Sequence, residues 1–183
     1  LGVRVIPADV APGQTYWQII GVHHLTPEEN KGKHNLFAEI VDADGERIRE
    51  PALQLQWSWE GQQPGEASPA KAFDKPDSEP AASLDLYGGQ HVRAIVAGDG
   101  CPSDTVENVH TNHPDEHGPG GETWNSVGHH SFYVVFQRTK KAATPAVTNG
   151  GEGATDGTNP TTQPVVGRIR VRDKLGIDAN RPI

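Results

Sequence analysis

The residues best suited to chemistry are histidines and carboxylates gathered between residues 107 and 141, a stretch with five of the nine histidines. The run HTNHPDEH places His110, His113, Asp115 and His117 close together. Imidazoles and carboxylates are the usual ligands of zinc, and carboxylates also bind calcium. The run therefore predicts a candidate site for one divalent ion, zinc or calcium, although its spacing matches no named zinc signature.

The same run also fits an ordered polar loop that holds no metal. Asn, Asp and similar side chains bond to nearby backbone groups and so stabilise loops. The acidic stretch Asp74, Asp77 and Glu79 lacks the spacing of a calcium loop and is interpreted as solvated. The chain has no nucleophile elbow, phosphate-cradling glycine loop or HExxH motif, so nothing points to an enzyme or to named catalytic residues.

Two histidine pairs lie in similar contexts, GVHHL at residues 21–25 and GHHSF at residues 128–132. Adjacent residues of a strand point to opposite faces, so one histidine of each pair should point inward. His130 is in phase with Phe132 and Phe136, which makes it the expected buried member. If the two strands are neighbours, the inward histidines would form a polar cluster; otherwise each is a locally bonded structural histidine.

Exposed aromatic rings are the second kind of candidate, because flat rings can stack on sugars. Trp124 lies in a glycine-rich loop without apolar periodicity, so it is the first candidate ligand-binding platform. Tyr87, followed by two glycines, is the second. Tyr16 and Trp17 should point to opposite faces of a strand. One of the two should then be exposed, and Tyr16 is the third candidate.

Composition restricts the class of partner. Residues 1–141 carry 11 Lys and Arg against 20 Asp and Glu, a net charge of −9. Such an acidic body argues against nucleic acid and against an anionic membrane surface. Cys101 is the single cysteine, so no disulfide can form within the chain. No apolar run approaches the roughly 20 residues that a membrane-spanning helix needs, so membrane insertion is not expected.

Short β-prone segments separated by Gly and Pro predict an all-β protein. The clearest is residues 53–60, where two leucines and two tryptophans alternate with polar residues. Residues 26–33 and 61–80 are expected to be loops. The pattern favours an immunoglobulin-like β-sandwich of about six to eight antiparallel strands with long Pro/Gly-rich loops. Strands are expected at 15–25, 34–42, 53–60, 105–109 and 130–138. Residues 83–96 are expected to hold either one strand or two strands with a turn at the glycine pair.

The chain is expected to have three parts. Residues 1–141 form the sandwich, and residues 142–164 are a Gly/Thr/Pro linker too polar to form a core. Residues 165–183 contain one amphipathic strand that either docks back or begins a further module. Because the chain begins with Leu rather than Met, we expect it to be part of a longer protein.

Three runs together carry a resemblance to a known kind of domain: YWQIIGVHHLTPEENKGKHNLFAEIVDADG, VHTNHPDE and SVGHHSFYVVFQRTK. Over residues 1–141 the chain resembles an uncharacterised β-sandwich accessory domain of modular bacterial surface and cell-wall proteins. The resemblance implies a bacterial extracellular or envelope location and no catalytic residues. It implies neighbouring modules as partners.

These observations predict a non-catalytic module that binds a polysaccharide or another cell-wall or surface component. One alternative is a structural or assembly subunit that pairs with neighbours through residues 165–183, since an exposed sheet edge accepts a further strand. Another is a metal-binding protein or metalloenzyme centred on the histidine run. The identity of the ligand is left open by the sequence.

Overall fold

The computed structural model describes residues 2–111 and 130–143. By its internal contacts the chain divides into two compact units, Leu1–Ala142 and Ala143–Ile183. The predicted strand in residues 165–183 lies outside the described residues. The helix of the described part is a four-residue turn, so no helix there could cross a membrane.

The described residues form nine strands, more than the six to eight expected. They are β1 (Arg4–Ile6), β2 (Thr15–Leu25), β3 (Asn35–Val41), β4 (Glu50–Trp59), β5 (Ala70–Phe73), β6 (Ala82–Asp85), β7 (Val92–Ala97), β8 (Thr105–Val109) and β9 (Ser131–Lys140), with the helical turn α1 (Pro27–Asn30) between β2 and β3.

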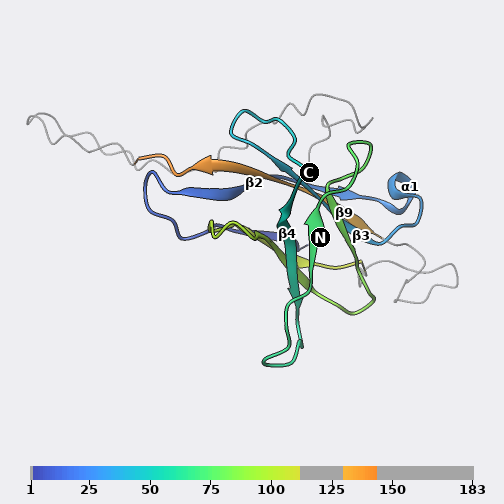
Figure 1. The fold of residues 1–183 in the computed structure, drawn as a ribbon. Helices are drawn as coiled ribbons and strands as arrows, with labels where there is room; N and C mark the ends of the chain where they lie inside the picture. Colours follow the sequence, from blue (N-terminus) through green and yellow to red (C-terminus); the bar gives the residue numbers. More distant parts are fainter. Residues whose placement is uncertain (1, 112–129, 144–183) are drawn as a thin grey trace, which may run out of the picture. The chain divides into compact units, whose positions relative to one another are not determined.

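The strands form two sheets, which confirms the all-β architecture and is consistent with a β-sandwich. One sheet has five strands in the order β1-β8-β7-β4-β5, and the other has four in the order β2-β9-β3-β6. Neighbours are antiparallel except β3 and β9, which run parallel. Figure 1 shows the long strands β2 and β9 side by side, with β4 in the other sheet.

A single apolar core is built from alternating residues of both sheets. On β4, Leu53 and Leu55 are fully buried, and Trp57 and Trp59 of the same face are half-buried against the core. The predicted apolar face of this strand is therefore confirmed. The period-two pattern repeats on β3, β7 and β9. Their fully buried members are Leu36, Ala38 and Ile40 of β3, Val92, Ala94 and Val96 of β7, and Phe132, Val134 and Phe136 of β9.

Two segments interpreted as loops contain regular structure. Residues 61–80 include the short strand β5, which the polar sequence around it concealed; its Phe73 is fully buried. The helical turn α1 begins with a capping box. The N–H of Thr26 bonds to Glu29 Oε2 at 2.9 Å, and the N–H of Glu29 bonds to Thr26 Oγ1 at 3.3 Å. The spacing Thr-x-x-Glu is a sequence signal for such a start.

Candidate functional site

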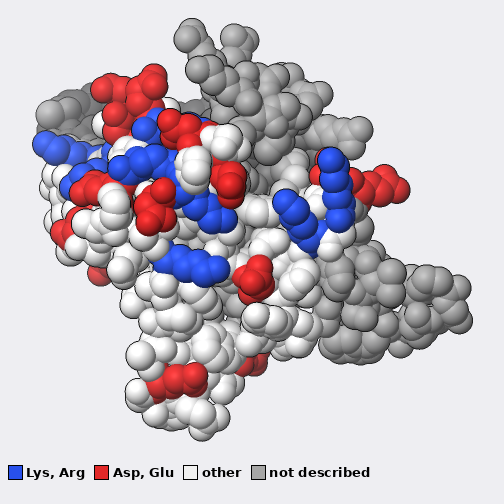
Figure 2. All heavy atoms as spheres, turned by 45° about the vertical axis from the view of Figure 1, so that its right-hand side comes forward, with Lys and Arg blue, Asp and Glu red and all other residues white. Residues whose placement is uncertain are grey.

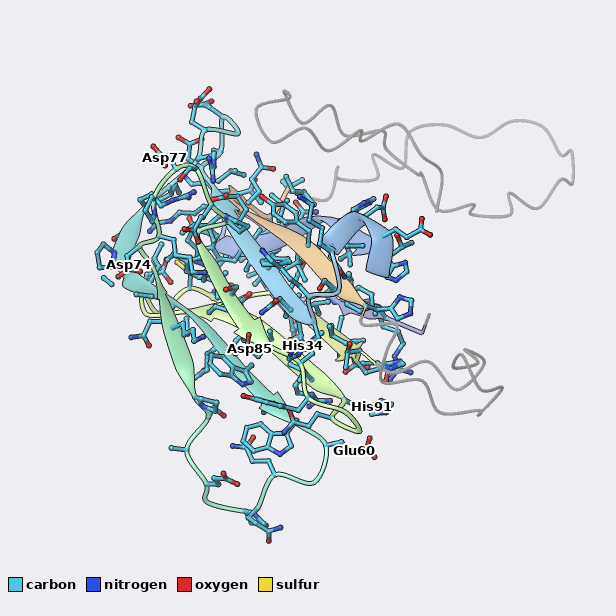
Figure 3. The ribbon with its side chains drawn as sticks, turned by 90° about the vertical axis from the view of Figure 1, so that its right-hand side faces the viewer. His34, Glu60, Asp74, Asp77, Asp85 and His91 are labelled. Atoms are coloured by element: carbon cyan, nitrogen blue, oxygen red, sulfur yellow. The ribbon has the colours of Figure 1, made fainter. Side chains whose placement is uncertain are left out.

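Six of the nine histidines belong to the described part of the chain, and they lie at one end of the two sheets. Here β2, β6 and β8 finish, and β3, β7 and β9 begin. In Figure 3, His34, Asp85, His91 and Glu60 lie near this end, whereas Asp74 and Asp77 lie at the opposite end. We call this region the histidine end and define it by His24, His34, His91, His110 and His130.

His24 and His130 contact each other directly through their rings. His24 Nε2 lies 2.7 Å from His130 Nδ1. His24 pairs with Phe132 across the β2–β9 ladder. His130, two residues earlier on the same face, is therefore its diagonal neighbour. His130 is 8% exposed. The expected burial of His130 and the expected polar cluster are thereby confirmed.

His91 and His110 form a second pair at the same end. Their rings stack with centroids 4.7 Å apart and planes inclined by 19°. His91 Nδ1 donates to Asn108 Oδ1 at 2.6 Å, and Asn108 Nδ2 donates to the carbonyl of Gly2 at 2.8 Å. Asn108 has a φ of 58°, a left-handed conformation that asparagine tolerates better than most residues. The second pair is thus oriented by a side-chain amide.

Buried hydroxyl groups tie the strand ends together at the histidine end. The N–H of His130 donates to Thr111 Oγ1 at 3.2 Å. Ser131 Oγ accepts the N–H of Asn35 at 2.9 Å and donates to the carbonyl of Lys33 at 3.0 Å. Ser131 is fully buried. These bonds hold the start of β9 against the residues that follow β8 and those that precede β3.

Tyr87 presents an open aromatic ring between β6 and β7. Its residue is 60% exposed, and its ring meets His34 edge-on with centroids 6.4 Å apart. His34 Nδ1 donates to the carbonyl of Leu86 at 2.6 Å, which orients the imidazole beside the tyrosine. Asp85, two residues earlier, is also exposed. Its Oδ1 accepts a hydrogen bond from Asn35 Nδ2 at 2.6 Å. A flat ring with an imidazole at its edge suits a ligand with both apolar and polar faces.

Of the predicted metal ligands, only His110 lies within the described residues. His113, Asp115 and His117 lie outside them, as does the predicted platform Trp124. His110 is buried and stacked on His91. Over residues 2–111 and 130–143, no three His, Cys, Asp or Glu side chains are grouped so that they could hold a metal ion.

The prediction that Tyr16 serves as an exposed platform is wrong. Tyr16 is 6% exposed and Trp17 is fully buried, so neither face of this part of β2 is open. Burial raises the pKa of the Tyr16 hydroxyl, with a further contribution from Asp104. Trp17 is enclosed because its N–H bonds to the carbonyl of Pro102 and its indole N–H bonds to Asp99 at 3.1 Å. Burial by the segment that precedes β8 cannot be recognised from the alternation of one strand.

The sequence did not single out His34 and His91 as members of a site. His34 directly precedes β3, and His91 directly precedes β7. The expected strands 34–42 and 83–96 included these two histidines, so the sequence contained no signal that they precede strands. Their common position follows only from the strand order, which places the starts of β3 and β7 at one end.

The acidic loop at the opposite end is held by arginines. The Asp77 side chain is 82% exposed, but its carbonyl accepts a bond from Arg47 Nη1. Arg47 and Arg49 also donate to the carbonyl of Glu79 at 2.7 and 3.1 Å. The arginines thus fix the loop by its backbone, which indicates a structural role.

No known protein family, curated protein or solved structure that was compared with the chain matches it.

Proposed function

We propose that this chain is a non-catalytic glycan-binding module of a bacterial extracellular or envelope protein. Its described binding surface is the exposed ring of Tyr87 at the histidine end. The resemblance of residues 1–141 to an accessory domain of modular surface proteins supports the location and the class.

The observation that carries the proposal is the exposure of Tyr87. In the described part of the chain the exposed large hydrophobic side chains are Val5, Ile6 and Tyr87, and only Tyr87 is aromatic. One exposed hydrophobic side chain is ordinary on a protein surface. Tyr87 differs because it is aromatic and because the imidazole of His34 meets the edge of its ring, so a sugar stacked on the ring would lie close to a polar group.

Charge favours a neutral glycan as the ligand. Residues 1–141 have a net charge of −9, which repels an anionic polymer at neutral pH. Figure 2 shows Lys and Arg interleaved with Asp and Glu on one face, without a broad region of positive charge there. A polymer such as chitin or cellulose, with polar edges and apolar ring faces, fits this surface better than an acidic polysaccharide.

The test is co-sedimentation of the purified chain with insoluble cellulose, chitin and peptidoglycan. Tyr87→Ala should abolish binding to the glycan that the unaltered chain selects, because the ring supplies the stacking face. Ile6→Ala, which also removes an exposed apolar side chain but lies on β1, should bind normally. Both variants should keep the unfolding midpoint of the unaltered chain.

Trp124→Ala is the third variant in the panel. Loss of binding in Trp124→Ala with normal binding in Tyr87→Ala would move the platform to Trp124 and overturn the assignment of Tyr87. Absence of binding to every glycan would reject the proposed function. An assembly role through residues 165–183 would then become the leading explanation.

We further propose that the sandwich is immunoglobulin-like. The strands β8-β7-β4-β5 are adjacent in one sheet, and β3 and β6 are paired antiparallel in the other. This order corresponds to the G-F-C-C′ and B-E strands of immunoglobulin domains. In this interpretation β2 and β9 extend the second sheet beyond β3.

A further inference from the structure

The contact between His24 and His130 has the geometry of a hydrogen bond. Their nitrogens are 2.7 Å apart. The ring centroids are 4.9 Å apart and the planes are inclined by 22°. The distance between the centroids is close to the sum of the N···N distance and the distance from each nitrogen to the centroid of its own ring. The rings therefore meet nearly end-on through their nitrogens. Two histidines that ligate one tetrahedral ion would instead converge on it at an angle.

An N–H···N bond between imidazoles restricts the number of protons on the pair. One nitrogen must carry a hydrogen and the other must offer its lone pair. The bond therefore exists when both rings are neutral or when one is protonated. When both rings are protonated, two N–H groups and two positive charges face each other, and the bond cannot form.

The surroundings of His24 oppose its protonation. The pKa of His24 is lowered to about 4. The largest cause is burial, and the second is the charge of His130. His23 acts in the same direction, whereas Glu29 of α1 acts in the opposite direction. The ring also lies against Phe132, with centroids 5.3 Å apart. The groups on β2, β9 and α1 together thus favour an uncharged His24.

The pair occupies a position where its loss would affect several strand ends. His24 is at the end of β2, and His130 directly precedes β9. The N–H of His130 bonds to Thr111, and the next residue, Ser131, holds the start of β3. The side-chain bond between the histidines therefore reinforces the junction of β2, β9 and β3.

We propose that His24 and His130 form a proton-sharing latch across the junction of β2, β9 and β3, which holds at neutral pH and breaks in acid, when the pair takes up a second proton. The latch does not depend on the proposed glycan function, because it follows from the geometry of the pair.

The sign of the pH dependence follows from the shift of His24. Because the folded state disfavours protonated His24, the stabilisation is fully present above the unfolded pKa of about 6.5. It is lost as pH falls from there toward about 4. Acid should therefore destabilise the unaltered chain more than a variant without His24.

The direct test is an NMR measurement of scalar coupling across the hydrogen bond in full-length chain labelled with ¹⁵N-histidine. At pH 7 a cross-peak should join His24 Nε2 and His130 Nδ1, and it should vanish below about pH 4 and in both His24→Gln and His130→Gln. Absence of the cross-peak at neutral pH in folded chain would overturn the proposal. Its absence together with stabilisation by added zinc would identify a metal-binding pair instead.

The second measurement is the melting temperature between pH 7 and pH 4. From pH 7 to pH 4 the unaltered chain should lose roughly 5 °C more than His24→Gln. His23→Gln is the neighbouring control. This histidine points to the other face of β2 and is a lesser cause of the His24 shift than burial and His130, so its pH profile should lie closer to the unaltered chain than to His24→Gln. Identical pH profiles for all three proteins would contradict the latch.

Discussion

At the scale of single residues, the strongest electrostatic feature is a buried glutamate between two arginines. The side chain of Glu39 is 4% exposed and pairs with Arg47 and Arg49, whose side chains are 30% and 18% exposed. Tyr133 lies beside it, and burial, with the charge of Glu39 as the second cause, raises the pKa of the Tyr133 hydroxyl. Glu39 thereby anchors the arginines that hold the loop around Asp77.

Replacing Glu39 with Gln should destabilise the chain by roughly 3 kcal/mol, because two partly buried guanidinium groups would lose their counter-charge. Urea denaturation measures the effect. Glu107→Gln is a matched control: Glu107 also pairs with two arginines, Arg4 and Arg93, but these are 67% and 62% exposed. It should cost less than about 1 kcal/mol. Equal losses in the two variants would refute the assigned role of Glu39.

At the scale of elements, Asp104 links the two sheets. It is 5% exposed. Its Oδ1 accepts the N–H of Ala8 after β1 at 2.8 Å, and its Oδ2 accepts the N–H of Ile19 in β2 at 2.9 Å. Its own N–H donates to the carbonyl of Trp17 at 2.8 Å. One carboxylate thus satisfies backbone donors from two segments and closes the corner between the sheets.

Asp104→Asn should cost roughly 2 kcal/mol, because the new amide nitrogen must face one of the two backbone N–H groups. Thermal unfolding monitored by circular dichroism gives the change. In the turn after β3, Asp42 provides the control, since its Oδ1 alone accepts the N–H groups of Asp44 and Glu46. Asp42→Asn keeps that oxygen and should have little effect; a loss as large as that of Asp104→Asn would count against this explanation.

At the scale of the whole molecule, the buried core of the described residues belongs to the first unit. Every residue of the core cluster lies between Trp17 and Phe136, and the first compact unit ends at Ala142. The charge also divides there: residues 142–183 carry 5 Lys and Arg against 4 Asp and Glu, whereas the preceding residues are strongly acidic. Folding of the first unit should therefore not require the second.

A chain that ends at Ala142 should unfold cooperatively with the same midpoint as the full chain, because it keeps every core residue of the described part. Scanning calorimetry measures this midpoint, and sedimentation velocity at several concentrations measures assembly. A lower midpoint would show that the C-terminal residues contribute to the fold. Assembly of the full chain that disappears on truncation would support the alternative of pairing through residues 165–183.

The all-β class and most of the strand positions could be predicted from the sequence, because turn residues and period-two alternation are local properties. The residues Leu53 to Trp59 show this most clearly. Local pattern also identified His130 as buried. The local pattern did not reveal β5, whose four residues lie in a polar segment. It also predicted that Tyr16 is exposed, whereas both faces of this part of β2 are covered.

Which of these strands are neighbours could be learned only from the folded structure. The pairing of β2 with β9 brings His24 against His130, and the β7–β8 pairing stacks His91 on His110. The residues in these pairs are far apart in the chain, so no periodicity relates them. Their proximity follows from strand order and register, which depend on how the two sheets bury a common core.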